Sequence, residues 1–157
     1  MPDIKPVHVL NGPNLNLLGV REPDVYGHAT LADIEALCRD AGARHGVEIV
    51  FEQTNHEGQL VDWIQRAGRE ASAIVINPAA YTHTSIALLD ALKGVDVPAV
   101  EVHLSQPAAR EAFRAVSYAA RAAAGSISGF GPLGYALGIE AAVQLARARQ
   151  SHPVKGT

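Results

Sequence analysis

Amide, hydroxyl, imidazole and carboxylate side chains gather in this chain at the ends of four short apolar runs. They are Asn11, Asn14 and Asn16 after the first run, Thr54, Asn55, His56 and Glu57 after the second, Asn77, Tyr81, Thr82, His83, Thr84 and Ser85 after the third, and Glu101, His103 and Ser105 around the end of the fourth. If these runs are parallel strands, their carboxyl ends meet at one edge of a sheet, where α/β proteins bind ligands. Loops are polar in most proteins, but four such clusters in a chain otherwise rich in Ala, Val and Leu favour a real site.

Glu101 and His103 could act together as a proton donor. They are two residues apart in an apolar run, so in a strand both side chains point to the same face. A carboxylate beside an imidazole fixes the tautomer of the ring and raises its proton affinity, which suits a general acid. A purely structural Glu–His pair at a strand end explains the same pattern equally well.

Arg21 and Tyr26 lie in an irregular segment, residues 11–28, that is too long for an ordinary strand-to-helix loop. Long loops of this kind often cover an active site. A phenol has a pKa of about 10, so a tyrosine that acts as a base near pH 7 needs a shift of about 3 units, or roughly 4 kcal/mol. A nearby guanidinium could supply much of that shift. An exposed arginine and a loop-anchoring tyrosine are the simpler reading of the spacing alone.

The backbone N–H groups of Leu104 and Ser105 precede a segment with helical spacing, residues 107–118. The N-terminus of a helix readily binds a carboxylate, so a substrate carboxylate could bind here. Alternatively, Ser105 could simply be the N-cap of that helix. Arg110 and Arg114 would share one face of that helix, which could equally be a solvated face.

The elements that must position these groups alternate along the chain. We expect strands at residues 7–10, 47–51, 73–76, 99–102 and 125–128, and helices at 30–44, 57–69, 85–92, 107–118 and 133–149. Five strand–helix repeats predict an α/β fold, a flavodoxin-like three-layer structure with a five-stranded parallel sheet of order 2-1-3-4-5. Residues 1–157 should form a single catalytic domain with loose tails at about 1–5 and 150–157.

Local signals mark the ends of two of these helices. Thr30 and Asp33 have the form of a capping box, with Asp in place of the usual Glu. Gly46 and Gly94 follow their helices where a residue with left-handed backbone is expected.

Composition excludes several classes of function. A net charge of -3 argues against a nucleic-acid surface. No run of 18 apolar residues is available to cross a membrane. A single cysteine, Cys38, leaves no disulfide to form, and no apolar leader is evident, so we expect a cytoplasmic protein.

Two other patterns suggest rival functions. The run from Gly129 to Gly134 matches the G-x-G-x-x-G of dinucleotide-binding proteins, but Pro132 removes an N–H donor and no strand follows to carry a ribose-binding acid. The histidines and glutamates at the strand ends lack the H-E-x-x-H spacing of a metalloenzyme. A flavodoxin-like nucleotide- or flavin-binding module remains the main alternative.

The chain resembles the type II 3-dehydroquinate dehydratases from Val7 to about Ala146. The resemblance rests on five motifs in the same order and spacing: Leu10-Asn-Gly-Pro-Asn-Leu-Asn16, Arg21-Glu-Pro with Tyr26-Gly27, Thr54-Asn-His-Glu-Gly58, Ile76-Asn-Pro with Ala80-Tyr-Thr-His-Thr-Ser85, and Glu101-Val-His-Leu-Ser105. It implies a lyase of the shikimate pathway, which makes chorismate and the aromatic amino acids. The substrate would be 3-dehydroquinate and no metal or cofactor would be needed.

By this resemblance water would leave by trans-elimination through an enolate. Tyr26 would be the base, Arg21 would lower the pKa of its phenol, and His103, oriented by Glu101, would protonate the departing hydroxyl. Asn14 and Asn77 would help to hold a contact at the enolate oxygen. The three lysines fit no Schiff-base role of the kind that type I enzymes use for the same reaction.

The resemblance also implies how substrate and subunits are held. Substrate would be bound by Asn77, His83, Arg114 and the backbone of Leu104 and Ser105, with Asp90 reaching in from a neighbouring subunit of a homo-oligomer, a dodecamer built as a tetramer of trimers. Leu89 departs from the family, which often has Arg at the position before this aspartate.

Overall fold

The computed structural model describes residues 3–20 and 22–152, apart from the side chain of Tyr26. Within them, parallel strands form one sheet in the order β2-β1-β3-β4-β5. The strands are β1 (Val7–Asn11), β2 (Ile49–Gln53), β3 (Ala73–Asn77), β4 (Ala99–His103) and β5 (Gly125–Ser128). This confirms the strand order expected from the sequence, and each strand lies within two residues of its expected bounds.

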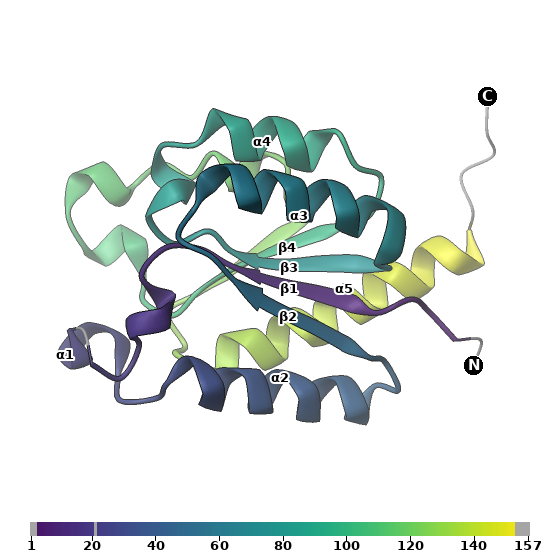
Figure 1. Ribbon diagram of the computed structural model, residues 1–157, viewed down its shortest axis with the longest axis horizontal. Helices are drawn as coiled ribbons and strands as arrows, with labels where there is room; N and C mark the ends of the chain where they lie inside the picture. Colours follow the sequence, from purple (N-terminus) through teal and green to yellow (C-terminus); the bar gives the residue numbers. More distant parts are fainter. Residues whose placement is uncertain (1–2, 21, 153–157) are drawn as a thin grey trace.

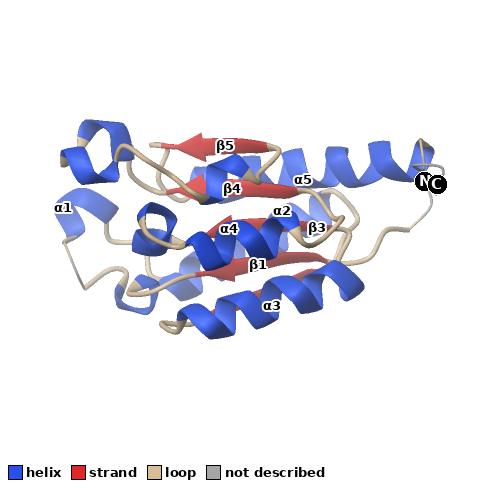
Figure 2. Cartoon of the chain, turned by 90° about the horizontal axis from the view of Figure 1, so that it is seen from above, coloured by secondary structure: helices blue, strands red, loops and turns tan. Residues whose placement is uncertain are grey.

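Helices cover both faces of the sheet (Figures 1 and 2). The pair on one face is α2 (Leu31–Arg44) and α5 (Leu133–Ser151), and the pair on the other is α3 (Glu57–Glu70) and α4 (Ile86–Lys93). The three-layer flavodoxin-like architecture is therefore confirmed. None of the helices in this described part of the chain is both long and apolar enough to cross a membrane.

The long connection between β1 and α2 contains two short helical turns. They are a three-residue 3-10 helix (Leu15–Leu17) and a single turn of α-helix, α1 (Pro23–Tyr26). Figure 1 shows α1 beyond the carboxyl ends of the strands, so this connection extends over the edge of the sheet where the polar clusters were expected.

Cap residues explain where α2 begins and ends. Thr30 Oγ1 accepts a hydrogen bond from the backbone N–H of Asp33, and the Asp33 carboxylate accepts one from the Thr30 N–H, which confirms the capping box. Gly46 has the expected left-handed backbone, with φ of 69°. The same expectation was wrong for Gly94, whose φ of -78° continues the right-handed turn at the end of α4.

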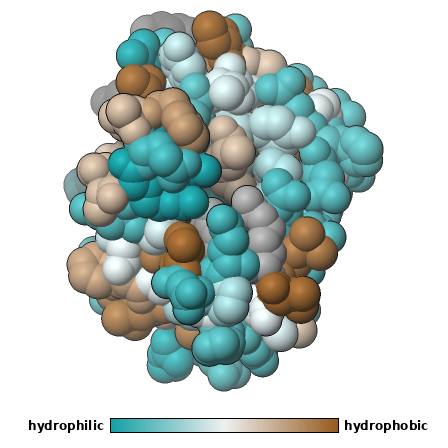
Figure 3. Space-filling model, turned by 90° about the vertical axis from the view of Figure 1, so that its left-hand side faces the viewer, coloured by the Kyte–Doolittle hydropathy of each residue, from teal (hydrophilic) through white to brown (hydrophobic). Residues whose placement is uncertain are grey.

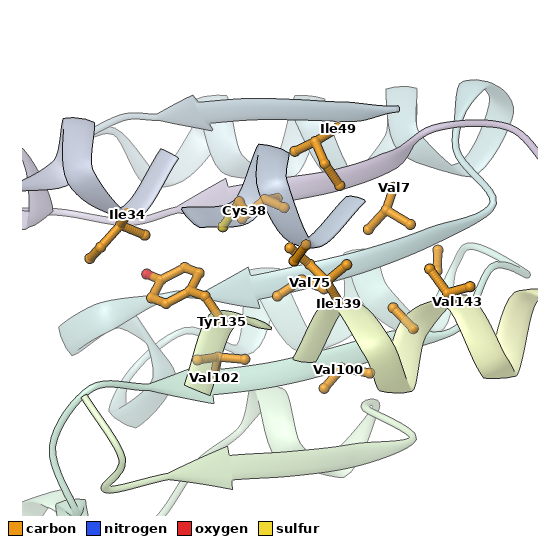
Figure 4. Packing of buried hydrophobic residues seen from close by; sticks show 14 of the residues in the cluster. Val7, Ile34, Cys38, Ile49, Val75, Val100, Val102, Tyr135, Ile139 and Val143 are labelled. Atoms are coloured by element: carbon orange, nitrogen blue, oxygen red, sulfur yellow. The ribbon is translucent and has the colours of Figure 1, made fainter. Parts of the chain in front are cut away.

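The hydrophobic core has two parts, one on each face of the sheet. On the α5 face, Tyr135, Ile139 and Val143 lie against the sheet and share a cluster with Val75 of β3 and the valines of β4 (Figure 4). A Cβ on Gly138 would lie 2.8 Å from a methyl group of Val102, so glycine at that position lets α5 approach the sheet closely. This close packing holds the carboxyl ends of β3 and β4 in a fixed position.

The helix expected at residues 107–118 does not form. The chain instead makes two 3-10 turns, Pro107–Ala109 and Ala112–Arg114, separated by extended backbone at Arg110 and Glu111. No residue from 107 to 118 is buried. Because helices in proteins gain most of their stability from packing an apolar face, a segment without a buried face has little reason to form one.

Candidate active site

A pocket opens at the carboxyl ends of β1, β3 and β4. Its walls come from residues 13–18 after β1, residues 77–83 at and after the end of β3, and residues 103–114 at and after the end of β4. Figure 3 looks onto this end of the molecule, where hydrophilic side chains predominate and hydrophobic ones are scattered between them. The expected site at the strand ends therefore exists as a cavity.

The ends of β1 and β3 approach each other too closely for any side chain at Gly12. Its N–H donates to the carbonyl of Asn77 at 2.8 Å, and a Cβ there would lie only 2.4 Å from the carbonyl oxygen of Pro78. Two pocket residues beside this contact, Asn14 and Ala79, have left-handed backbone although neither is glycine, with φ of 67° and 53°. Such strained conformations are concentrated at functional sites.

His103 and Glu101 form the expected pair. The Nε2 atom of His103 lies 2.6 Å from Oε1 of Glu101, and His103 lines the pocket. An ionised carboxylate can only accept hydrogen bonds, so Nε2 carries the hydrogen. The other ring nitrogen, Nδ1, is then the one available for proton exchange with a ligand.

Glu101 is almost fully buried and is surrounded by hydrogen-bond donors. Its carboxylate accepts from Thr82 Oγ1 at 2.5 Å, from Ser117 Oγ at 2.7 Å and from Ser126 Oγ at 3.2 Å. Burial alone raises the pKa of Glu101. The hydrogen bond and the charge of His103, with the hydrogen bonds from Thr82 and Ser117, outweigh it and lower the pKa to about 2. Glu101 is therefore an anion at neutral pH.

His83, also in the pocket wall, has its tautomer fixed by the backbone. Its Nδ1 lies 2.7 Å from the carbonyl oxygen of Val116, which can only accept, so Nδ1 carries the hydrogen. The Nε2 atom of a neutral His83 is then a hydrogen-bond acceptor. The two pocket histidines therefore offer different ring nitrogens to a ligand.

A buried hydrogen-bond chain fixes the side chain of Asn77. Its Nδ2 donates to the hydroxyl of Tyr135 at 2.9 Å, and that hydroxyl donates to Oδ1 of Asn11 at 2.7 Å. Burial raises the pKa of Tyr135 well above its usual range, so the phenol keeps the proton that it donates. The N–H of Ala79 donates to Oδ1 of Asn77 at 3.0 Å. Asn77 therefore presents its amide to the pocket in a single orientation.

Leu104 and Ser105 line the pocket with backbone N–H groups that have no hydrogen-bond partner among the described residues. Ser105 is not a helix cap, contrary to the alternative reading. Its hydroxyl instead lies 3.5 Å from a guanidinium nitrogen of Arg110. A carboxylate bound here would meet two N–H groups and nearby arginines rather than a helix terminus.

Both arginines of the 107–118 segment line the pocket although the helix that would have aligned them is absent. The resemblance implied Arg114 rather than Arg110 as the substrate contact, and the structure places both arginines in the pocket wall. Arg114 donates from Nε to the two carboxylate oxygens of Glu111 at 3.2 and 3.3 Å, which holds its guanidinium at the pocket wall.

Four expected site residues do not line this pocket. Glu101 is buried and contacts the pocket residue His103. Arg21 and the side chain of Tyr26 lie outside the described residues. Asp90 is exposed on α4 and lines a separate groove between α3 and α4. Its expected role was contact with another subunit, which a single chain does not test.

The glycine-rich run after β5 serves to pack the loop against β4. The N–H of Gly129 donates to the carbonyl of His103 at 3.3 Å, and that of Gly131 donates to the carbonyl of Leu104 at 3.0 Å. These amides are therefore not directed at a phosphate. In residues 3–20 and 22–152, no three His, Cys, Asp or Glu side chains come together as a metal site.

Comparisons with known proteins match nearly the whole chain. The family model described as "Dehydroquinase class II" matches residues 5–143. The 3-dehydroquinate dehydratase of Phenylobacterium zucineum (strain HLK1) is 60% identical over 143 residues, which cover 91% of this chain and 99% of that protein. The corresponding enzyme of Caulobacter vibrioides is 59% identical over 145 residues, 92% of this chain and 99% of that one. The crystal structure of the type II dehydroquinase from Propionibacterium acnes has a TM-score of 0.86 at 41% identity, covering 89% of this chain and 97% of that chain.

Proposed function

The chain belongs to the class II dehydroquinase family, and on that premise we propose that it removes water from 3-dehydroquinate to give 3-dehydroshikimate. This is a hydro-lyase reaction of the shikimate pathway. The observation that carries the proposal is the pair of His103 and a buried, anionic Glu101 at a pocket. The pocket wall also offers the N–H groups of Leu104 and Ser105, which are unpartnered among the residues that the structure describes. The pair supplies a proton donor, and the N–H groups supply a binding site for the substrate carboxylate.

The first half of the proposed reaction is removal of the proton alpha to the ketone. Tyr26, as its phenolate, takes this proton, and Arg21 stabilises the phenolate by its fixed positive charge. The electrons move into the carbonyl to form an enolate. The amides of Asn14 and Asn77 help to hold a contact at the enolate oxygen. The fixed orientation of Asn77 supports this role, because preorganised dipoles stabilise developing charge best.

The second half is loss of the hydroxyl group. The His103 imidazolium gives its Nδ1 proton to the departing oxygen, the carbon–oxygen bond breaks, and the enolate electrons form the new carbon–carbon double bond. Glu101 keeps Nε2 protonated throughout and remains an anion, in line with its pKa of about 2. Water and a conjugated enone are the products.

Groups on three sides of the pocket position the substrate. The N–H groups of Leu104 and Ser105 bind the carboxylate, while His83 and Arg114 bind the remaining hydroxyl groups. Asn77 contributes from the end of β3. This division of roles agrees with the chemistry of each group, since backbone N–H groups and guanidinium are donors and a neutral His83 Nε2 is an acceptor.

We also propose that the protein is a dodecamer, a tetramer of trimers, acting in the cytoplasm as a single catalytic domain. Asp90 supports the assembly because its exposed position on α4 leaves it free to reach a neighbouring subunit. Sedimentation equilibrium should give a mass near twelve times 16.5 kDa. A mass near that of one chain would contradict the assembly.

The activity is tested by mixing the protein with 3-dehydroquinate and following the ultraviolet absorbance of the enone. We expect turnover that survives prior treatment with a chelator. Borohydride added with the substrate should leave the activity intact, because no imine is formed. Absence of the enone signal would refute the dehydratase, and covalent trapping by borohydride would refute the enolate route.

A further inference from the structure

We propose that Thr82, assisted by Ser117, is a positioning residue whose hydroxyl group holds the Glu101 carboxylate and thereby keeps Nδ1 of His103 available to the substrate. The inference rests on the proposed function, since it concerns the proton donor of that reaction. Thr82 follows β3 and is almost fully buried, and it has no place in the pocket wall. Its hydroxyl group therefore acts on the pocket through Glu101 rather than by direct contact with a ligand.

Two hydroxyl oxygens and one carboxylate oxygen of this network lie within hydrogen-bond distance of one another. Thr82 Oγ1 and Ser117 Oγ lie 2.5 and 2.7 Å from Oε1 of Glu101, and 2.6 Å from each other. Two hydroxyl hydrogens serve these three contacts, and the two hydroxyls cannot both donate to each other. At least one hydrogen therefore points to Glu101 in every arrangement, which keeps the carboxylate a hydrogen-bond acceptor.

The hydroxyl pair also restricts how the carboxylate can turn. Oε1 is shared by Thr82, Ser117 and His103, while Oε2 is contacted by Ser126 of β5. Rotation of the carboxylate would break several of these bonds at once. Because hydrogen bonds to charged groups are stronger than neutral ones, the network favours a single orientation of the His103 ring.

Backbone contacts tie Thr82 and Ser117 to each other. The N–H of Tyr118 donates to the carbonyl of Thr82 at 2.7 Å, and the ring of His83 donates to the carbonyl of Val116 at 2.7 Å. The segment around Ser117 is therefore joined to the segment that carries both Thr82 and the pocket residue His83. The stretch from Val116 to Tyr118 therefore positions the pocket residue His83. Through Glu101 it also positions the proton donor, His103.

The test compares Thr82→Val, which has a similar shape without the hydroxyl, with Thr82→Ser, which keeps the hydroxyl. We expect Thr82→Val to lower kcat about tenfold with KM changed by no more than about twofold. Thr82→Ser should stay within about threefold of the unchanged protein. In a Glu101→Ala background, Thr82→Val should have almost no further effect, because neighbours that act through one group are not additive.

A second measurement is independent of turnover. Nitrogen-15 NMR of histidine-labelled protein, with the His103 signal identified by its loss in His103→Gln, should report the Nε2–H tautomer in the unchanged protein and a mixture of tautomers in Thr82→Val. If the protein were not a dehydratase, the unchanged protein would show no turnover while the NMR result would still decide the positioning role. If Thr82→Val fails to fold by thermal melting, Ser117→Ala against Ser117→Thr replaces it.

Three results would overturn the inference. One is a Thr82→Val protein with unchanged kcat and an unchanged His103 tautomer. Another is a Thr82→Ser protein as impaired as Thr82→Val, which would assign the loss to packing. The third is a full additional loss from Thr82→Val in the Glu101→Ala background.

Discussion

Replacing Tyr26 by phenylalanine is expected to lower kcat at least about a hundredfold while the reaction product still binds. Phenylalanine keeps the ring but has no oxygen to take the proton alpha to the ketone. A phenol with an ordinary pKa of about 10 is a poor base at neutral pH, so the prediction depends on Arg21 stabilising the phenolate. Turnover is followed by enone absorbance and product binding by calorimetry.

Tyr118→Phe is the matched control for this experiment. Tyr118 does not line the pocket, and its ring lies against the guanidinium of Arg121, with 5.3 Å between the guanidinium carbon and the ring centre. Loss of its hydroxyl should leave kcat nearly unchanged. A Tyr26→Phe protein with near-normal turnover would remove Tyr26 from the mechanism, and loss of product binding would mean that the substitution disturbed the pocket as a whole.

The sheet and its catalytic edge could be predicted because they depend on short-range patterns. Buried apolar runs specify the strands, and alternation along β4 places Glu101 and His103 on one face, where they are indeed in contact. The alternation of strands and helices then restricts the topology to a small number of arrangements. The strand ends, and with them the location of the pocket, follow from the order of the elements.

The segment after β4 could not be predicted from periodicity. Its spacing suggests a helix, with Arg110 and Arg114 on one face, but periodicity does not tell whether a partner exists for the other face to pack on. No residue of this stretch is buried in the folded chain. The backbone instead contacts the segment after β3, through Val116 and Tyr118, and these contacts depend on the tertiary fold.

The surroundings of Glu101 were likewise beyond sequence reasoning. Thr82, Ser117 and Ser126 belong to three separate segments, and nothing in their spacing joins them to one carboxylate. The chain from Asn77 through Tyr135 to Asn11 is similar, since its ends belong to neighbouring strands and its middle to α5. Buried polar networks between distant segments become visible only when the fold is known.

Replacing His103 by glutamine is expected to lower kcat by about a hundredfold to ten-thousandfold, the usual contribution of a general acid. Glutamine is chosen because its amide can still donate to Glu101. A side chain without a donor would leave a buried carboxylate short of a partner, and breaking a buried ion pair in that way typically costs about 3–5 kcal/mol of stability. The amide cannot give a proton to the departing hydroxyl, so elimination should fail while the fold is kept.

Exchange of the proton alpha to the ketone separates the roles of His103 and Tyr26. In heavy water His103→Gln should still replace this proton by deuterium, seen by proton NMR of the substrate, because Tyr26 and the enolate contacts remain. Tyr26→Phe should lose exchange and elimination together. Loss of exchange in His103→Gln would place His103 in the first half of the reaction, and near-normal kcat would remove it as the acid. The enolate can form without the acid, but water cannot leave without it. His103→Gln should therefore stop the reaction after the enolate has formed, and Tyr26→Phe should stop it before.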